Sequence, residues 1–316
     1  MASIAITEFG ELDPAPAIAA LEAAGHEVMY LGTRDVEEIV RRVSNCEALI
    51  VAFAPVDADT IARLPALSII ATASVGFNHV DTAAAAAQGI TVCNIPSVAS
   101  EEVATHALAG ALYLLRELGP ATAQVREGGW NYGEVPLPPR VSELSLGLYG
   151  FGRIARELAV RALPLFASVV AYDPFVAEAA WHPGVVRAES LDALLRESQV
   201  LSLHAPATPE TRGIINREAL AQLPAGAILV NVARGDLVDE AALLDALDSG
   251  RLRSAFLDVT DPEPPSLEAP IRSHPRVAVT PHAAFRSAGS VRDYLMIPVE
   301  NVLAALAGGE PPNRVA

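Results

Sequence analysis

The segment 150–155, which reads GFGRIA, has the residue types that hold a dinucleotide cofactor. Gly150 permits a tight turn after the apolar run Leu146–Tyr149, and Gly152 lets the backbone come close to a pyrophosphate. Ala155 allows the following helix to pack closely on the strand. The pyrophosphate would then rest on the unpaired N–H groups at the positive end of that helix. Because glycines also mark ordinary turns, the motif needs support from elsewhere in the chain.

A carboxylate at the end of the next apolar run supplies that support. Asp173 follows Val169–Tyr172 and lies 23 residues after Gly150. A carboxylate at this place accepts hydrogen bonds from the adenine ribose hydroxyls, and it would repel a 2′-phosphate. No basic residue occurs between Asp173 and Arg187 to neutralise such a phosphate. The sequence therefore predicts NAD rather than NADP as the cofactor. The alternative is that Asp173 and Pro174 only cap a turn.

Short apolar runs alternate with stretches of helical spacing along most of the chain, and these elements must position the cofactor residues. Two of the helical stretches are 154–166 and 240–249. Such alternation is typical of an α/β fold with helices on both faces of a parallel sheet. The runs expected to be buried parallel strands are Ser3–Thr7, Ala48–Phe53, Ile69–Ala73, Leu146–Tyr149, Val169–Tyr172, Val200–His204, Ile228–Val232 and Ala255–Val259.

Charge and composition disfavour several classes of function. Acidic residues number 38 against 22 basic ones, and the net charge of −16 disfavours binding to nucleic acid or to anionic membranes. No uncharged stretch is apolar enough to span a bilayer, and the first charged residues, Glu8 and Glu11, are unlike the basic start of a signal peptide. Lysine is absent, which excludes Schiff-base chemistry. Two isolated cysteines, Cys46 and Cys93, predict reduced thiols in a cytoplasmic protein.

The segment 94–100 is the expected junction between two domains. Pro96 ends a strand there, and Ser100 with Glu101 and Glu102 is typical of a helix start. The helix that follows, about 101–118, is apolar on most of its faces, so it must be buried within one domain or between subunits. This helix suggests a homodimer.

Four further segments extend the pattern. They are NVARGDLVD at 231–239, LDVTDPEP at 257–264, TPH at 280–282 and SVGFNHVD at 74–81. Together with the glycine-rich loop, these ordered motifs resemble the D-isomer-specific 2-hydroxyacid dehydrogenases over essentially the whole chain. The nearest branch is that of glyoxylate/hydroxypyruvate reductases and phosphoglycerate dehydrogenase-like enzymes.

The resemblance implies two Rossmann-like domains. Residues 1–98 and 285–316 would form a flavodoxin-like substrate domain, and residues 99–284 an inserted NAD-binding domain with a doubly wound parallel sheet. The active site is expected in the cleft between the domains, and the family is expected to form homodimers.

The resemblance also implies a catalytic triad of Arg234, Glu263 and His282. An Arg fork can hold the carboxylate and the carbonyl oxygen of a 2-keto acid. A protonated His282 would stabilise the charge that develops on the carbonyl oxygen and donate a proton to it, while Glu263 orients the imidazole. Taken singly, the three have ordinary alternatives, namely an exposed ion pair, a solvated acidic loop and a structural histidine. No metal is expected, since no histidine at ligand spacing accompanies Glu263.

Other positions match the family's binding sites. Val75 and Gly76 match a turn whose N–H groups receive the substrate carboxylate, and Asp258 matches a position that binds the nicotinamide carboxamide. His79 and His106 are expected to be structural. The remaining expected cofactor contacts are Phe151, Arg153 and Ile154 in the glycine-rich loop, His204, Pro206 and Thr211 beside the phosphates and adenine, and Val232 and Ala233 beside the nicotinamide.

The residues that face the substrate side chain favour an unphosphorylated 2-keto acid, such as glyoxylate, hydroxypyruvate or one with a small apolar group. Relatives that act on phosphorylated acids resemble one another in placing an Arg in the loop at 52–56, where this chain has AFAPV and Phe53 offers an apolar wall. If the substrate is phosphorylated, Arg286 is the suspected ligand, in a segment (283–287) that departs from the family pattern.

Two functional alternatives stay open. One is phosphoglycerate dehydrogenase-like activity, and the other is a non-catalytic, NADH-sensing binding protein of the corepressor type. A formate dehydrogenase is disfavoured because Glu263 stands where those enzymes use Gln. Thr105 and Thr260 also depart from the family pattern.

Overall fold

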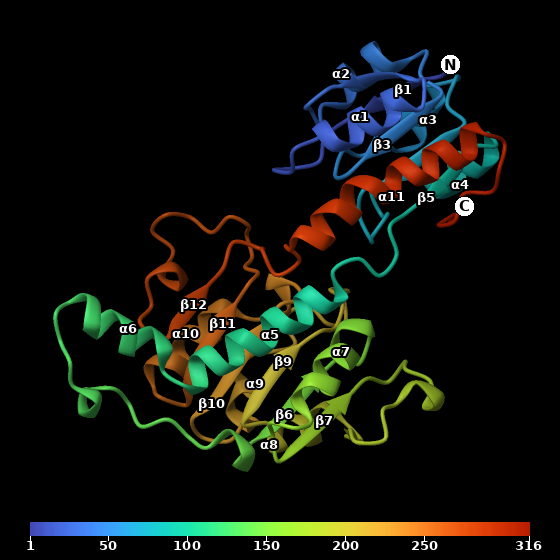
Figure 1. The fold of residues 1–316 in the computed structure, drawn as a ribbon. Coiled ribbons are helices and arrows are strands. Elements are labelled where there is room, and N and C mark those ends of the chain that lie inside the picture. Colours follow the sequence, from blue (N-terminus) through green and yellow to red (C-terminus); the bar gives the residue numbers. More distant parts are fainter. The chain divides into compact units, whose positions relative to one another are not determined.

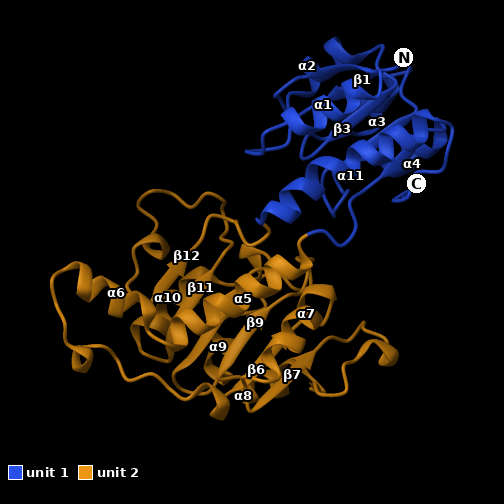
Figure 2. Ribbon diagram, in the orientation of Figure 1, with its two compact units in different colours: residues 1–98, 286–316 blue, residues 99–285 orange.

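The computed structural model describes residues 1–316, and the chain divides into two compact units (Figures 1 and 2). Unit 1 comprises residues 1–98 and 286–316, and unit 2 comprises residues 99–285. Each unit has its own all-parallel sheet, so the α/β fold with two Rossmann-like parts is confirmed. None of the helices combines the length and the apolar character that a membrane crossing requires.

Unit 1 is a five-stranded sheet in the order β2-β1-β3-β4-β5. β3 and β4 are buried on both faces, because one apolar cluster packs under α2, α3 and α4 and another under α1 and α11. The chain returns to this unit at its end to supply α11. The elements are β1 (Ser3–Ile6), α1 (Ala15–Ala23), β2 (Glu27–Tyr30), α2 (Val36–Val43), β3 (Ala48–Val51), α3 (Ala58–Ala62), β4 (Ile69–Thr72), α4 (Thr82–Ala87), β5 (Thr91–Cys93) and α11 (Ala288–Leu306).

Unit 2 is a seven-stranded sheet in the order β12-β11-β10-β9-β6-β7-β8. Helices α5 and α7 cover one face, and α8, α9 and α10 cover the other (Figure 1). The elements are α5 (Ser100–Leu115), α6 (Leu118–Arg126), β6 (Ser145–Tyr149), α7 (Arg153–Ala162), β7 (Ser168–Tyr172), β8 (Val186–Arg187), α8 (Leu191–Glu197), β9 (Val200–Leu203), α9 (Arg217–Gln222), β10 (Ala227–Asn231), α10 (Glu240–Asp248), β11 (Leu252–Leu257) and β12 (Val277–Val279).

All eight strands expected from the sequence are present, and four more accompany them. The additional strands are β2, β5, β8 and β12, which are the two edge strands of each sheet. Edge strands are short and most are half exposed, so they lack the long apolar run that marks an interior strand.

The helix expected over about 101–118 is confirmed as α5, which ends three residues earlier, and a second helix follows it. α5 ends at Leu115, and Glu117 adopts a left-handed conformation (φ 54°) that starts α6 in a new direction. α6 has no buried residue, so the break separates a buried helix from an exposed one.

Candidate active site

Three neighbouring strands of unit 2 end side by side, and the residues expected to be catalytic follow them. Arg234 comes after β10, Glu263 lies in the loop after β11, and His282 comes after β12. Because the carboxyl ends of parallel strands meet at one edge, that edge is where open α/β sheets bind ligands. The topology therefore collects all three residues at the binding edge of the same sheet.

His282 and Glu263 form a direct hydrogen bond at this edge. His282 Nδ1 lies 2.7 Å from Glu263 Oε2, and the other oxygen of Glu263 accepts from the Thr260 N–H at 3.1 Å. The ionised carboxylate can only accept, so Nδ1 carries the proton. The second ring nitrogen, Nε2, has no hydrogen-bond partner in the structure, and the side chain is about half exposed. The pair thus fixes the imidazole and leaves Nε2 open to a ligand.

The backbone of His282 is held in a conformation that residues with a side chain rarely adopt. Its φ is +50°, and its N–H donates to the Asp258 carbonyl at 2.8 Å and to the Thr280 carbonyl at 3.0 Å. A left-handed conformation outside glycine costs free energy and persists only where the surroundings enforce it. The loop after β12 is therefore shaped to present this imidazole.

Asp258 enforces that shape. Its carboxylate accepts from the N–H of Ala283 at 2.8 Å, the N–H of Ala284 at 3.0 Å and the Thr280 hydroxyl at 2.6 Å. The residue is only 2% exposed. All of these partners belong to the loop that carries His282, so the hydrogen bonds of Asp258 hold that loop in place. The expected contact with the nicotinamide carboxamide stays a prediction.

His106, expected to be structural, lies beside the same carboxylate. Its Nε2 is 3.1 Å from the Thr280 hydroxyl and 3.5 Å from Asp258 Oδ1, and its ring packs against Phe256. No spacing rule links a residue in α5 to the ends of β11 and β12, so the sequence offered no signal for this contact.

Arg234 is placed on the same edge by a buried asparagine and by a close backbone contact. Asn231 donates to the Arg234 carbonyl at 2.8 Å and accepts from the Ala233 N–H at 3.1 Å. A Cβ on Gly235 would meet the Thr260 carbonyl at 2.0–2.1 Å, so only glycine lets the turn after β10 approach the loop of Glu263. The Arg234 guanidinium is exposed, and its one hydrogen bond is to the Ala233 carbonyl at 2.6 Å.

The glycine-rich loop leaves space where a cofactor phosphate would lie. Gly150 has φ +87°, and a Cβ there would meet the backbone of Ala205 at 2.6 Å. Gly152 caps α7 without a side-chain hydrogen bond, and a Cβ there would meet nothing within 4 Å. The N–H groups at the start of α7 thus face open space, as the binding of a pyrophosphate requires.

Asp173 also lies beside this loop. One carboxylate oxygen accepts from the Phe151 N–H at 2.8 Å and the other from the Phe175 N–H at 2.9 Å. The Phe151 side chain is fully buried and stacks on Trp181, so this residue packs the core, and only its backbone can lie near a cofactor. The same carboxylate therefore orders the loop and stands at the position that would bind a ribose.

The other expected cofactor residues are placed as follows. Arg153 is exposed at the first turn of α7, and Ile154 packs partly into the core beneath it. The Thr211 hydroxyl donates to the Pro206 carbonyl at 2.7 Å, which closes the loop after β9. Val232 is buried and Ala233 half-buried in the turn after β10.

His204, at the end of β9, has one satisfied and one unsatisfied ring nitrogen. Nε2 lies 2.8 Å from the Ser202 hydroxyl, while Nδ1 is buried without a partner. Burial lowers the pKa of His204 to about 3, so the imidazole is neutral. A buried nitrogen without a partner beside the glycine-rich loop is consistent with a polar group supplied by the cofactor.

Unit 1 places Val75 and Gly76 directly after β4. The Val75 carbonyl accepts from Asn94 at 2.8 Å, and the Gly76 carbonyl accepts from Ser74 at 2.6 Å. The N–H groups of Val75 and Gly76 donate to no backbone acceptor. Phe53 follows β3 on the same edge of this sheet and is exposed. The carbonyls are thus held while the N–H groups are left for a ligand.

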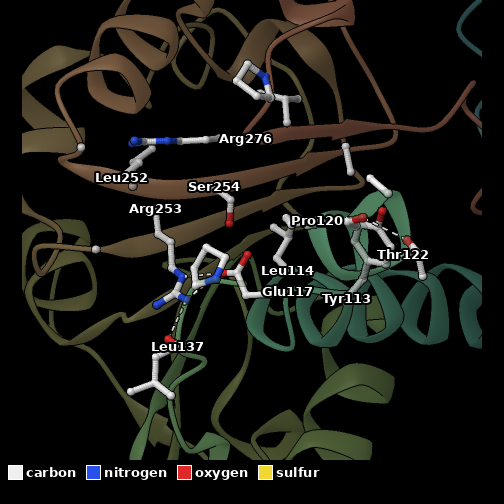
Figure 3. A pocket seen from close by; sticks show the side chains of 18 of the residues that line it. Tyr113, Leu114, Glu117, Pro120, Thr122, Leu137, Leu252, Arg253, Ser254 and Arg276 are labelled. Atoms are coloured by element: carbon white, nitrogen blue, oxygen red, sulfur yellow. Dashed lines mark hydrogen bonds and ion pairs between the residues drawn. The ribbon is translucent and has the colours of Figure 1, made fainter. Parts of the chain in front are cut away.

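A large cavity of unit 2 lies away from the catalytic edge. It measures about 1070 Å³ and is lined by α5, α6, the segment 136–137 and the amino ends of β11 and β12 (Figure 3). Arg253 crosses it, with Nε 2.7 Å from Glu117 Oε1 and a terminal nitrogen 2.9 Å from the Leu137 carbonyl. Since Arg234 and His282 follow the carboxyl ends of the strands, this cavity belongs to the opposite edge of the sheet.

Comparison with known proteins shows which family the chain resembles. A family described as "D-isomer specific 2-hydroxyacid dehydrogenase, NAD binding domain" matches residues 108–284. A glycerate dehydrogenase of Methylorubrum extorquens is 38% identical over 90% of this chain and 90% of its own length. A D-3-phosphoglycerate dehydrogenase of Mycobacterium tuberculosis is 39% identical over 92% of this chain, but the chain spans only 54% of that protein. The solved structure of the TT0316 protein of Thermus thermophilus is 38% identical, with a TM-score of 0.89 over 99% of this chain and all of that one.

Proposed function

The chain belongs to the D-isomer specific 2-hydroxyacid dehydrogenases, and we propose that it is an NAD-dependent oxidoreductase that interconverts a 2-keto acid and a D-2-hydroxy acid. The resemblance inferred from the sequence is thereby confirmed, as is NAD as the cofactor. The observation that carries the proposed reaction is the 2.7 Å bond from His282 to Glu263, which leaves Nε2 open on an exposed ring.

Each residue of the triad has a distinct part in the proposed reaction. Bound NADH supplies the hydride that reduces the keto carbon. Protonated His282 donates its Nε2 proton to the keto oxygen, and in the reverse direction it accepts that proton from the hydroxyl. Glu263 keeps Nδ1 protonated and stabilises the imidazolium. Arg234 holds the substrate carboxylate and keto oxygen with its planar fork, and the N–H groups of Val75 and Gly76 receive the carboxylate.

We propose that residues of unit 2 hold the cofactor. The α7 N-terminus at Gly152 would take the pyrophosphate, Asp173 would take the adenine ribose hydroxyls, and His204 would lie beside the phosphates. What supports NAD over NADP is that Arg187, the nearest basic residue along the chain after Asp173, is paired with Glu178 at 2.8 Å and lies over Trp181. No free cation of that segment can neutralise a 2′-phosphate.

We further propose that the substrate is unphosphorylated. The exposed ring of Phe53 stands at the carboxyl edge of unit 1, and the nearest basic residue along the following segment, Arg63, is bound by both oxygens of Glu37 at 2.7 Å. Relatives that bind a phosphate place a charged fork in the loop at 52–56, and that loop has no arginine here. The alternative, phosphoglycerate dehydrogenase-like activity, is favoured by the M. tuberculosis relative, and Arg286, which is exposed, would then be its candidate ligand.

We also propose that the protein is a homodimer and that residues 118–140, here called the arm, fill the large cavity of a second copy. The arm leaves Trp130 89% and Tyr132 95% exposed, and neighbouring exposed aromatic side chains are typical of an interaction surface. The base of the arm lines the cavity in Figure 3, so a two-fold exchange would bury both features at once. Sedimentation at micromolar concentration should give twice the chain mass, and Trp130→Ala with Tyr132→Ala should shift the protein to monomer. A wild-type monomer would contradict this.

We propose a cytosolic location because the two cysteine thiols are not joined in a disulfide. Cys46 and Cys93 are both free and buried, in separate apolar clusters of unit 1. Buried reduced thiols are typical of proteins in a reducing compartment.

The proposed reaction is tested by following NADH oxidation with glyoxylate, hydroxypyruvate, 2-ketobutyrate and 3-phosphohydroxypyruvate, with NADPH in parallel. The proposal expects turnover with NADH and an unphosphorylated keto acid. Binding of NADH without turnover on any keto acid would support the NADH-sensing alternative instead, and the highest kcat/KM on 3-phosphohydroxypyruvate would support the phosphoglycerate dehydrogenase-like one.

A further inference from the structure

A second group of chemically distinctive side chains lies at the carboxyl edge of the unit 1 sheet. β1 and β3 are neighbours, but the chain leaves β1 toward β2 on one side and continues from β3 toward β4 on the other. In open α/β sheets, the crevice at such a reversal of strand order is where ligands bind. Glu8 follows β1 and Phe53 follows β3, so both stand at this point, on the same edge as Val75 and Gly76.

Glu8 is a buried carboxylate that fixes the position of Phe53. It is 5% exposed, and its Oε1 accepts from the N–H of Phe53 at 2.6 Å and of Ala54 at 3.2 Å. Its Oε2 accepts from the Thr7 hydroxyl. With these bonds made, little of the carboxylate's capacity to accept hydrogen bonds is left for a ligand.

Arg34 lies over the same ring. It comes from the loop between β2 and α2, and its guanidinium carbon is 4.6 Å from the centre of the Phe53 ring. Its Nε is 3.6 Å from Glu8 Oε1, yet the side chain remains 57% exposed. A guanidinium held by a ring and a carboxylate is pre-organised, and its terminal N–H groups still point to solvent. Nothing in the loop that carries Phe53 indicated this cation, because it comes from a different part of the chain.

The charge around Arg34 is balanced. Glu8 offsets the positive charge, and burial lowers the pKa of the nearby His79, so that imidazole adds no further cation at neutral pH. A phosphate with two negative charges would meet a group with no net charge, whereas a neutral hydroxyl needs only donors and a fixed position. An apolar group would leave the guanidinium donors without a partner.

We propose that Arg34, held on the ring of Phe53 by Glu8, recognises the distal group of the keto acid, and that this group is a neutral hydroxyl, as in hydroxypyruvate. The inference rests on the proposed function and names its substrate class. Arg34 makes this contact in the ground state, so its loss should act on KM more than on kcat.

The test compares Arg34→Leu, Arg34→Lys and wild type on hydroxypyruvate, glyoxylate and 3-phosphohydroxypyruvate with NADH. Glyoxylate has no distal group, so the ratio of kcat/KM for hydroxypyruvate to that for glyoxylate isolates the contact. A hydrogen bond from a charged donor predicts that this ratio falls about tenfold in Arg34→Leu, mainly through KM. Arg34→Lys, which keeps a charged donor but loses the fork, should restore part of it. Arg42→Leu, which removes an exposed arginine of α2 paired with Glu38, is the matched control and should leave the ratio unchanged.

The outcomes separate the two levels of the argument. Turnover with an unchanged ratio in Arg34→Leu overturns this inference and leaves the proposed function standing. Best turnover on the phosphorylated acid, lost in Arg34→Leu, overturns the assignment of a neutral distal group. Absence of turnover with every keto acid overturns the proposed function and this inference with it.

Discussion

A buried carboxylate holds a loop at the carboxyl edge of each sheet, Asp258 in unit 2 and Glu8 in unit 1. Each accepts hydrogen bonds from two consecutive backbone N–H groups and from one threonine hydroxyl. Each also lies near a basic side chain, since Asp258 is 3.5 Å from His106 and Glu8 is 3.6 Å from Arg34. The two loops differ in what they carry: the His282 imidazole in unit 2, and the exposed ring of Phe53 in unit 1.

The comparison shows how one device serves two purposes. Burying a carboxylate is costly unless hydrogen bonds satisfy it, and backbone N–H groups satisfy it while fixing a loop that has no regular structure. In unit 2 the fixed loop includes a left-handed residue, His282, whose ring we propose takes part in the chemistry. In unit 1 it presents the Phe53 ring, on which Arg34 from another loop lies, and both side chains can only bind. Mutation of the two carboxylates should therefore affect different kinetic constants.

The largest effect is expected when the imidazole itself is removed. His282→Ala should lower kcat about 10³-fold, because the proton donor is lost, while NADH binding is retained. Steady-state kinetics with hydroxypyruvate and NADH fluorescence titration measure the two quantities. His26→Ala, at a histidine of unit 1 whose Nδ1 accepts from the Ala2 N–H, is the control. A kcat within threefold of wild type in His282→Ala would remove the basis for assigning chemistry to this edge.

The next effect concerns the carboxylate beneath that imidazole. Asp258→Asn keeps the shape but cannot accept from both Ala283 and Ala284, so His282 should be displaced and kcat should fall about 10²-fold. KM for the keto acid should change less than kcat. Asp261→Asn, at an exposed position in the same segment after β11, should change neither. Equal losses in the two variants would show that charge near the site, and not the hold on the loop, is what matters.

A third prediction uses His204, which sits at the same edge of unit 2 without a carboxylate partner. Its pKa of about 3 means that it stays neutral in the folded protein, while the unfolded chain binds a proton below about pH 6.5. The stability it allows is complete above that pH and is lost as the pH falls toward 3. Between pH 8 and 5 this amounts to about 2 kcal/mol, or about 30-fold in the unfolding constant.

The His204→Asn variant removes this proton linkage. Urea unfolding at several pH values should show a shallower loss of stability on acidification than in wild type. Parallel curves for the two proteins would mean that the imidazole is solvated in the folded state. His204 would then not be an example of a buried side chain that is held at this edge without a charged partner.

The smallest effect is expected in unit 1. Glu8→Gln replaces the oxygen that accepts from Thr7 with a donor and removes the negative charge beside Arg34, so the ring and Arg34 should become less ordered and kcat/KM for hydroxypyruvate should fall about tenfold. The fall should appear in KM, in contrast to Asp258→Asn. Glu27→Gln, at an exposed carboxylate at the start of β2, is the control. A fall in kcat of the same size as in Asp258→Asn would contradict the division of roles between the two units.

The sequence predicts the interior strands of each sheet but not the edge strands. Buried strands such as β3 and β10 can be recognised as apolar runs in the sequence, because helices cover both of their faces. β8 and β12 are two and three residues long and partly exposed, so no pattern distinguishes them from loops. Where strands are short and half solvated, it is pairing with a neighbour, which is a tertiary contact, that makes the strand.

The residues of the candidate site also fall into those that the sequence predicts and those that only the structure shows. Ordered motifs located Glu263 and His282, whose hydrogen bond the structure contains. The roles of Asp258 in holding a loop, and of Glu8 and Arg34 at the other edge, could not be read from spacing, because each joins segments that only the fold brings together. Sequence motifs mark residues that react, whereas the residues that hold them are defined by burial and hydrogen bonding.

The most direct test of the account is the distance from His282 Nε2 to a bound substrate analogue. A crystal structure with NADH and oxamate, an unreactive isostere of a small 2-keto acid, provides it. The account predicts the carbonyl oxygen next to the amide nitrogen of oxamate about 2.6–3.2 Å from Nε2, with the Arg234 guanidinium on the carboxylate. Oxamate bound away from His282, or an Nε2 bonded to a protein group instead, would contradict it.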